Sequence, residues 1–531
     1  MNSFIETEAI IVILMLVATL VAIVARRISL PYTVSLVLVG LFMSIWRPLD
    51  VEVTPELILA LFVPPLVFEA AFHLDFKLLR ENLTPILMLA VPGVLVTTLL
   101  VGGIVALGTG TAIAVTCTFG ALIAATDPVA VVALFRALGV PQRLAVAVEG
   151  ESLFNDGTAI VVYQIALGAA LSGIFDPVEG VFDFLLVSAG GLTIGSVLGW
   201  LLAQAIARVD DRLIVTTLTT LLAYGAYLVA EEVHVSGVLA VVAAGLVSGN
   251  VGLSKTSPTT KIMLFNLWDF LAFLSNSMIF LLIGLTVDLP KLWEQIIPII
   301  IAVVAVLVSR AVVVYGISFL ISVLRRRKPH IPISWRHVLF WGGLRGAISL
   351  ALALSLPSVL AEREMLLEMT FGVVLFSLLI QGTTIQPLLK RLGLIQHSDP
   401  HLARETKLGR LFATHAGLKA LEKLYHEGLL TSEMWNGLRQ DYYETQGQLI
   451  DDMNQLFTEY AALEREMLLK ARQEALRAER GALGDAQRRG LISEHTYEQL
   501  RTEIDLRLEA LNMIYASTQK GWKALEEMQE K

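Results

Sequence analysis

The sequence contains little charge and almost no cysteine. Only 17% of its 531 residues are charged, and the single cysteine, Cys117, falls inside an apolar segment. An intrachain disulfide and a cysteine-based metal site are therefore excluded. The net charge of −8 is small for this length, and no basic patch suggests nucleic acid as a partner. No HExxH motif occurs, and none of the nine histidines lies near the acids at positions 151 and 156. We therefore expect no enzyme and no cofactor.

Apolar runs are what the sequence has in abundance. Hydrophobic residues make up 55% of the chain, the mean hydropathy is +0.69, and runs of membrane-spanning length recur. We predict an all-α polytopic membrane protein. Acids stand near the N-terminus where a secretion signal would carry Lys or Arg, so the first run is interpreted as a retained helix. About thirteen spans are predicted, centred near Val17, Leu38, Leu66, Val94, Ala125, Gly157, Ile194, Leu221, Val242, Ile279, Val304, Arg345 and Ser377.

The charge of the loops predicts the orientation, because cytoplasmic loops carry an excess of Lys and Arg. One set of loops holds fifteen basic residues: Arg26, Arg27, Lys77, Arg80, Arg136, Arg143, Arg208, Arg212, Lys255, Lys261, Arg325, Arg326, Arg327, Lys328 and Arg336. The opposite loops hold three, which are Arg47, Lys291 and Arg363. We therefore expect the N-terminus outside, the C-terminus in the cytoplasm, and a multi-pass protein of the plasma (inner) membrane.

The composition changes near Leu392. We expect a transmembrane domain over residues 1–392 and a cytoplasmic helical tail over 393–531, where Glu, Arg, Lys, Gln and Leu recur at helical spacing. The tail contains a weak repeat, because "GLLTSEMWNGLRQDY" from Gly428 resembles "GLISEHTYEQLRTEI" from Gly490, 62 residues later. In each copy a Gly stop precedes a Ser/Thr helix start, which predicts two helical hairpins.

Six ionisable residues fall inside the predicted spans. A charge at membrane depth costs about 2.5–3.5 kcal/mol on insertion scales, so such residues usually mark ion pathways or proton relays. The alternative is that they pair with one another and only orient helices. The six are Glu69, Asp127, Glu151, Asp156, Arg310 and Arg345.

Two of the predicted spans carry a signal for a break at their centre. In "AATDPVA", residues 124–130, the ring of Pro128 clashes with the carbonyl of residue 124, and the helix should end there. Asp127 would then offset the positive end of a half-helix. In "WGGLRGAISLALALSLP", residues 341–357, three glycines flank Arg345. Two interrupted helices seven spans apart predict an inverted-repeat transporter, with spans four to six matching spans eleven to thirteen.

The stretch "GESLFNDGTA", residues 150–159, places two acids in one apolar span. On a helix, Glu151 and Asn155 share a face, and Ser152 and Asp156 share the neighbouring face. We expect Glu151 to pair with Arg345 as a structural ion bridge, since a guanidinium binds a carboxylate through two hydrogen bonds. Asp156 is then left without a counter-charge and should accept a proton or a small hard cation. Ser152, the backbone of Thr126 and the carboxylate of Glu69 could supply further oxygens.

Five segments together resemble the monovalent cation:proton antiporter family, which includes bacterial NhaP and the Na⁺/H⁺ exchangers of animals and plants. They follow the family's order and span about residues 8–392, and jointly they are specific to it. They are "PPLVFEAAF" around Glu69, "ATDPVAVVALF" around Asp127, "EGESLFNDGTAIV" around Asp156, "SRAVVVY" around Arg310 and "WGGLRGAISLALAL" around Arg345.

The resemblance implies a homodimer in the lipid membrane, whose protomers combine a dimerisation bundle with a mobile six-helix core. It also implies alternating access of the elevator type, with two discontinuous helices that cross. Asp156 would bind the cation and the proton, with oxygens from Ser152, Glu69 and Thr126, and Asn155 would pair across the broken helices. Asp127 would belong to the same ion-binding group. Electrogenic relatives tend to carry Asp-Asp where this chain has Asn155-Asp156, so electroneutral one-for-one exchange is expected.

Alternatives stay open at this stage. A K⁺/H⁺ efflux antiporter of the same fold is the nearest one, and an ion channel is a more distant one, since no selectivity-filter repeat is visible. The choice among Na⁺, Li⁺ and K⁺ depends on sub-ångström cavity size, and Na⁺ is the first expectation. The activating pH and the role of the tail are not encoded in any motif of the sequence.

Overall fold

The structure is a computed structural model that separates into two compact units, Met1–Ile395 and Gln396–Lys531. It describes residues 2–28, 32–46, 58–209, 211–253, 256–287, 289–324, 332–394, 400–459, 461–508 and 511. The loop positions Arg47, Lys255 and 325–328, on which part of the predicted orientation depends, lie outside these residues. The division between the units falls close to the change in composition near Leu392.

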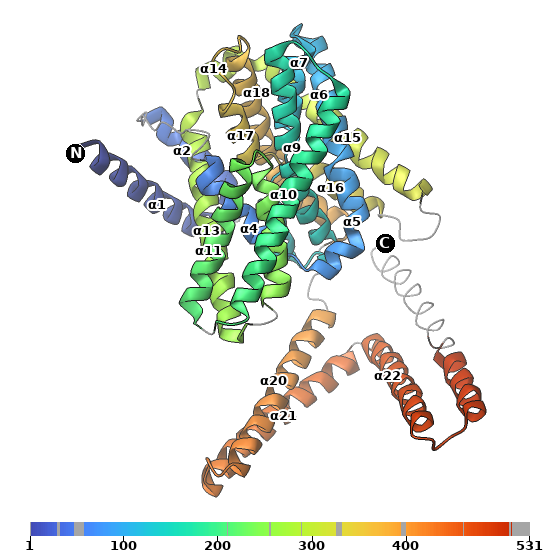
Figure 1. Cartoon of the computed structure of the whole chain (residues 1–531). Coiled ribbons are helices and arrows are strands. Elements are labelled where there is room, and N and C mark those ends of the chain that lie inside the picture. The colour runs from blue at the N-terminus through green and yellow to red at the C-terminus, as the bar shows by residue number, and fades with distance from the viewer. Residues whose placement is uncertain are drawn as a thin grey trace. The chain divides into compact units, whose positions relative to one another are not determined.

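The first unit is a bundle of helices, and its described residues contain no strand (Figure 1). Helices are the expected solution here, since every backbone polar group in a bilayer must find a partner within the protein. Its elements are α1 (Asn2–Ile28), α2 (Tyr32–Trp46), η1 (Ile58–Phe62), α4 (Val63–His73), α5 (Phe76–Ala90), α6 (Pro92–Thr109), α7 (Ile113–Leu122), α8 (Val129–Leu138), α9 (Gln142–Ser172), α10 (Pro177–Ile206), α11 (Arg212–Glu232), α12 (Gly237–Val247), η2 (Ser248–Gly252), α13 (Pro258–Thr286), α14 (Leu289–Glu294), α15 (Ile296–Leu324), α16 (Ile333–Trp341), α17 (Ala347–Leu354), α18 (Arg363–Phe376), η4 (Ser377–Gln381) and α19 (Gly382–Arg391).

Seven helical segments of the described chain are long and apolar enough to cross a membrane, and five more apolar helices are shorter. The protein is therefore an all-helical, multi-pass membrane protein. The count of thirteen spans stays a prediction, because several of the predicted spans correspond to short or interrupted helices. Both predicted interruptions are present: the helix is absent between α7 and α8 and between α16 and α17.

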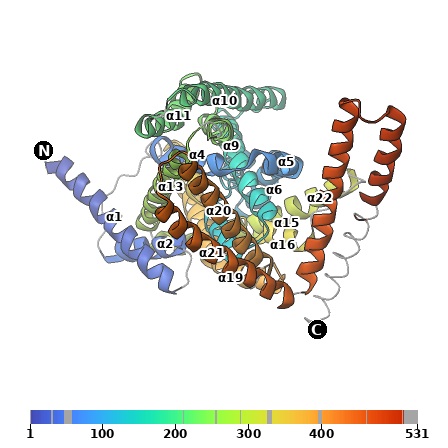
Figure 2. The same cartoon turned by 90° about the horizontal axis from the view of Figure 1, so that it is seen from below.

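The helices of the first unit pack in two groups. In one group α2 packs on α13, α4 on α12 and α13, and α10 and α11 on α12. In the other group α5 and α7 pack on α9, α6 packs on α7 and α15, and α18 packs on α15 and α17. The helix α9 of the second group also contacts α4, α10 and α12 of the first group, and Figure 2 shows it between α4 and α5. The long helix α9 therefore lies where the two groups meet.

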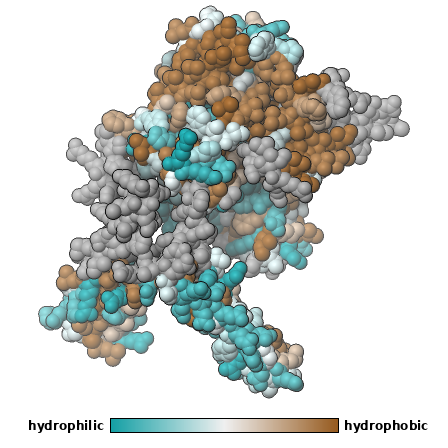
Figure 3. Space-filling model, turned by 180° about the vertical axis from the view of Figure 1, so that it is seen from behind, coloured by the Kyte–Doolittle hydropathy of each residue, from teal (hydrophilic) through white to brown (hydrophobic). Residues whose placement is uncertain are grey.

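The outer surface of this unit is apolar. Large hydrophobic side chains are exposed on it, and Figure 3 shows them as a broad brown surface. A soluble protein would hide such a surface, whereas lipid tails cover it in a membrane. Examples from several helices are Leu99, Leu107, Phe182, Trp200, Leu221 and Phe319.

The second unit contains α20 (Pro400–His426), α21 (Ser432–Glu459), α22 (Ala461–Arg488) and a helix over residues 494–508. The two copies of the sequence repeat form the same kind of turn. Gly428 and Gly490 both have a positive φ, 76° and 70°, as glycines that end helices commonly do. The hydroxyls of Thr431 and Ser493 then each accept a hydrogen bond from the backbone of the next helix.

Candidate functional site

The two interrupted helices cross at their non-helical segments. The backbone N–H of Asp127, between α7 and α8, donates to the carbonyl of Leu344, between α16 and α17, at 2.8 Å. Pro128 directly precedes α8 and has no N–H to continue the ladder of α7. The crossing therefore brings four half-helix ends together in the interior of the unit.

Opposite charges lie on the half-helix ends at this crossing. The carboxylate of Asp127 accepts a hydrogen bond from the first N–H of α8, that of Val129, at 3.0 Å. It also lies against Gly346 at the start of α17, where an added Cβ would be 2.2 Å from Asp127 Oδ2. A negative charge is favoured at helix N-termini. Arg345 lies at a helix C-terminus. Its Nη1 donates to the carbonyls of Ala124 and Ala125 at 2.7 and 3.0 Å, just past the end of α7.

Ser152 and Asn155 of α9 face this crossing. The hydroxyl of Ser152 donates to the carbonyl of Thr126, and the amide of Asn155 donates to the hydroxyl of Thr126 at 2.7 Å. The Asn155 carbonyl accepts from the Thr126 N–H at 3.4 Å. Ser152 and Asn155 are each only 2% exposed. The helix α9 is thus tied to the unwound segment between α7 and α8, and oxygens from both converge beside Asp156.

Asp156 lies one residue beyond Asn155 and lines a cavity. Among the described residues it has no ion-pair partner within 4 Å. The charges that act on it come from Asp127 and Arg345 at the crossing. A carboxylate that lines a cavity without a bound counter-charge can take up a cation or a proton from it.

The predicted ion pair between Glu151 and Arg345 is wrong. Both oxygens of Glu151 are bound instead by Arg310, which projects from α15; its Nη2 donates to Oε2 at 3.1 Å and its Nη1 donates to Oε1. Arg310 also donates to the carbonyl of Leu339. Its guanidinium crosses Gly343, where an added Cβ would be 2.7 Å from Arg310 Nε. Helical spacing indicates which face of α9 carries Glu151 but does not reveal which helix packs on that face.

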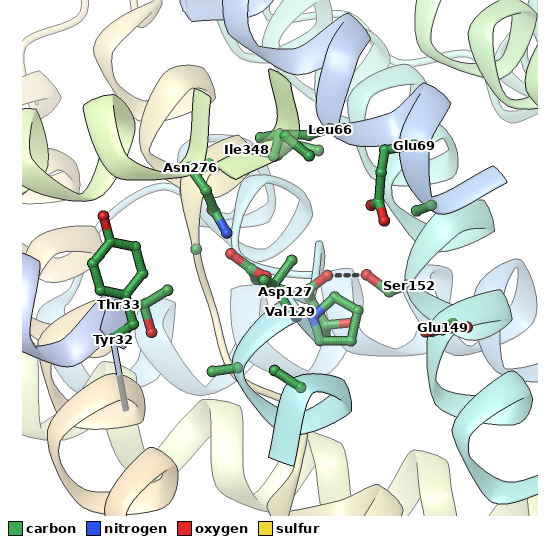
Figure 4. A pocket seen from close by; sticks show the side chains of 18 of the residues that line it. Tyr32, Thr33, Leu66, Glu69, Asp127, Val129, Glu149, Ser152, Asn276 and Ile348 are labelled. Atoms are coloured by element: carbon green, nitrogen blue, oxygen red, sulfur yellow. Dashed lines mark hydrogen bonds between the residues drawn. The ribbon is translucent and has the colours of Figure 1, made fainter. Parts of the chain in front are cut away.

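The cavity beside Asp156 has a volume of about 900 Å³. Figure 4 shows Glu69, Asp127, Ser152 and Asn276 around it. It extends to Glu149 and Asp269. The side chain of Asp269 is 56% exposed, so the cavity opens to solvent there. Its lining includes Ala25 and Leu138, which lie next to the basic positions Arg26 and Arg136 in the sequence. Ala347 and Leu350 also line a second, small void of about 10 Å³ among the described residues, whose lining is apolar apart from Thr286.

Of the acids predicted to share one site, Glu69 lies apart from the contacts between α9 and the crossing. It lines the same cavity, but its carboxylate interacts with His73, one helical turn away on α4. Sequence reasoning missed three polar residues that line the cavity, which are Glu149, Asp269 and Asn276. It also missed His73, which lies between Glu69 and Asp269. The i,i+4 spacing of Glu69 and His73 is a signal that could have linked those two, whereas no sequence signal connects either with Asp269.

Comparisons with known proteins give a match over most of the chain. Residues 12–391 match the family model described as "Sodium/hydrogen exchanger, transmembrane". The chain is similar to the Na⁺/H⁺ antiporter ApNhaP of Aphanothece halophytica, 40% identical over 383 residues, which are 71% of this chain and 73% of the relative. It is also similar to the Na⁺/H⁺ antiporter NhaG of Bacillus atrophaeus, 36% identical over 501 residues, which are 91% of this chain and 94% of the relative.

A solved structure shows the same fold. The sodium proton antiporter MjNhaP1 from Methanocaldococcus jannaschii at pH 8 superposes with a TM-score of 0.62. The match covers 74% of this chain and 100% of that chain, with 21% sequence identity. At this identity the likeness concerns the fold alone.

Proposed function

The chain belongs to the sodium/hydrogen exchanger family, and on that premise we propose that it is a secondary active antiporter that exchanges Na⁺ for H⁺. The observation that carries this proposal is Asp156, a carboxylate that lines the cavity and has no ion-pair partner within 4 Å among the described residues. Such a group can bind either ion but not both at once. Competition of two ions for one group is sufficient to couple their movements in opposite directions.

The surrounding oxygens support a site for a small hard cation. Na⁺ prefers oxygen ligands, as other hard cations do. The Ser152 hydroxyl, the Thr126 carbonyl and the Thr126 hydroxyl lie beside Asp156, and Glu69 reaches the same cavity. In this assignment Asn155 and Asp127 hold the crossed segments in place, and the Glu151–Arg310 pair anchors α9 to α15. No resident cofactor is required, because the transported ions themselves are the ligands. A K⁺/H⁺ antiporter of the same fold is the alternative for the transported cation.

The one-sided cavity supports alternating access. The site is reached through the cavity of about 900 Å³, which extends to the exposed Asp269 and to Ala25 and Leu138 next to the basic loops. The void at Ala347 has a volume of only about 10 Å³ and a mostly apolar lining. By the positive-inside rule the open side is the cytoplasm, so this conformation faces inward. For release outside, the group of helices with α9 and the crossing would shift against the group with α2, α4 and α13, as an elevator does. A continuous channel is disfavoured, because the path ends at the crossing. The chain would assemble as a homodimer in the plasma membrane, with the N-terminus outside and the C-terminus in the cytoplasm. Within each protomer, spans four to six and eleven to thirteen would form an inverted repeat.

Exchange in proteoliposomes tests this function. Purified protein is reconstituted with an imposed ΔpH, and dissipation of that gradient on addition of Na⁺, Li⁺ or K⁺ is followed with a pH-sensitive dye. We expect Asp156→Asn to insert normally and to lose the cation-induced signal. Asp176→Asn is the matched control, because Asp176 caps α10 at the surface and Asn can replace it there. Exchange by Asp156→Asn near the wild-type rate would exclude Asp156 as the carrier.

A further inference from the structure

A histidine and two carboxylates converge at the open end of the cavity. Glu69 and His73 lie one turn apart on α4, and Asp269 reaches them from α13. His73 Nε2 is 3.3 Å from Asp269 Oδ1, and His73 Nδ1 is 3.3 Å from Glu69 Oε1. One possible ligand atom from each of the three residues lies within 4.8 Å of the others. Of these three residues, only Glu69 is also assigned to the cation site at Asp156.

We propose that Glu69, His73 and Asp269 form a binding site for a divalent transition-metal ion, of which Zn²⁺ and Ni²⁺ fit the ligands best. Imidazole nitrogen together with carboxylate oxygen suits these ions. Mg²⁺ and Ca²⁺ prefer ligand sets made of oxygen alone, so the histidine discriminates against them. The nearby Arg136 forms an ion pair with Glu149 at 2.8 Å, which reduces the electrostatic repulsion between Arg136 and a bound metal ion.

The imidazole of His73 is oriented as a metal ligand. Its Nδ1 lies 2.9 Å from the backbone carbonyl of Glu69, so a proton on Nδ1 is donated there and the lone pair of Nε2 points toward Asp269. Metal-binding histidines usually donate their second N–H in this way. The ring of Phe265 packs at 4.8 Å between centroids and restrains the imidazole. A cation between Nε2 and the carboxylate oxygen, whether a metal ion or a proton on Nε2, satisfies both atoms at this separation.

The separation of His73 Nε2 and Asp269 Oδ1 fits one edge of a tetrahedral metal site. Zinc bonds to nitrogen and oxygen are about 2.0–2.1 Å long, which gives about 3.3–3.4 Å between two ligand atoms in a tetrahedron. The Nε2–Oδ1 distance of 3.3 Å matches this edge. Asp269 is 56% exposed, so an ion can enter from the solvent and water can fill the remaining position.

Occupation of this site would inhibit exchange. Glu69 and Asp269 both line the cavity that leads to Asp156, so a bound divalent ion places positive charge on the route of the transported cation. It also removes Glu69 as an oxygen ligand for that cation. This consequence depends on the proposed transport function, whereas the binding of the metal does not.

Calorimetry on the tag-free full chain in detergent tests the binding directly. We expect one equivalent of Zn²⁺ or Ni²⁺ to bind, with Mg²⁺ and Ca²⁺ far weaker. His73→Asn and Asp269→Asn should each weaken Zn²⁺ binding by at least about tenfold, since even residues that only support a ligand have effects of this size. His234→Asn is the matched control: His234 is exposed beyond α11 at φ 57°, which Asn also adopts, and its Zn²⁺ affinity should equal that of the wild type.

The outcomes separate the site from the transport function. Absence of Zn²⁺ binding, or binding that His73→Asn leaves unchanged, overturns the site and favours an imidazolium that simply bridges two carboxylates. In proteoliposomes we expect Zn²⁺ to slow Na⁺-driven exchange, with His73→Asn less inhibited relative to its own metal-free rate. Binding without inhibition overturns the regulatory consequence alone. Absence of exchange in metal-free wild type overturns the proposed function, and calorimetry still reports on the metal site.

Discussion

Glu151 on α9 and Arg310 on α15 form an ion pair through both carboxylate oxygens, at a depth where the two residues are only 2% and 8% exposed. Two charges removed from water this far require each other, because either one alone keeps its desolvation penalty without the compensating attraction. The pair fixes α9, and with it Asp156, relative to a helix of the same packing group.

A double-mutant cycle tests this pair. Glu151→Gln and Arg310→Met should each lower the stability of the purified protein by about 3–5 kcal/mol, because each leaves a buried charge unpaired. The double variant should recover part of that loss, which thermal unfolding in detergent measures.

The matched cycle uses Glu151→Gln with Arg345→Met, and its coupling energy should be smaller by about 1 kcal/mol or more. Arg345 binds the carbonyls of Ala124 and Ala125, so its loss acts on α7 rather than on Glu151. Equal coupling in the two cycles would contradict the pairing described above.

The glycine at the start of α17 gives a second prediction. Gly346→Ala should inactivate exchange, because the added Cβ would lie 2.2 Å from Asp127 Oδ2 and would separate the crossed segments. Gly316→Ala on α15 is the control, since an added Cβ meets nothing within 4 Å there. We expect that control to retain activity and to gain up to about 1 kcal/mol of stability. Wild-type exchange by Gly346→Ala would show that the crossing tolerates displacement.

The sequence predicts the interruptions of the helices better than the partners of the buried charges. Pro128 and the glycines around Arg345 act through local backbone geometry, so both breaks follow from short stretches of sequence. Ser152, Asn155 and Asp156 also follow from helical periodicity once α9 is assigned. Whether a given face of α9 packs on α15 or on α17 is decided by the tertiary arrangement. The sequence contains two arginines, Arg310 and Arg345, that could each pair with Glu151.

The approach of Asp269 to Glu69 and His73 could not be predicted from the sequence, for the same reason. Glu69 and His73 have a local relation on one helix, but Asp269 comes from α13, far along the chain. Asn276 lines the cavity from that helix too. No periodicity within α4 or α13 specifies that they pack together, so these contacts require the structure.

The pH dependence of cation affinity follows from competition at Asp156. As the pH falls, more of the carboxylate carries a proton, and the cation must displace that proton to bind. The apparent KM for Na⁺ should therefore rise on acidification, approaching about tenfold per pH unit when one proton is displaced. Initial rates at several Na⁺ concentrations and symmetrical pH measure this. An apparent KM that is constant between pH 6 and 9 (roughly the working range of such assays) would exclude a shared site.

The tail provides a prediction about regulation. A chain that ends after residue 395 keeps every intramembrane charge and the whole of the first compact unit. We expect it to retain exchange with a shifted pH profile or rate, measured in proteoliposomes beside the full-length chain. Complete loss of exchange in a truncated protein that unfolds at the wild-type temperature would make the tail part of the transport machinery.

Electroneutral exchange is the last prediction, and it follows from the charges around Asn155. Glu151 is matched by Arg310, and at the crossing Asp127 and Arg345 offset each other and the half-helix ends. Asp156 alone is left to change its state, so each crossing carries one cation or one proton. The membrane potential contributes about 2.3 kcal/mol per charge per 100 mV, and one-for-one exchange should not respond to it.

Proteoliposomes clamped at different potentials with K⁺ and valinomycin test this directly. Na⁺-driven pH change by the wild type should have the same rate and endpoint at every potential. Asn155→Asp is the informative variant. An aspartate there can keep accepting from the Thr126 N–H, and it can accept from the Thr126 hydroxyl to which the Asn155 amide now donates, while adding a second carboxylate beside Asp156. We expect that variant to become sensitive to the potential. Sensitivity in the wild type would mean that a second acid, Glu69 or Glu151, also cycles its proton.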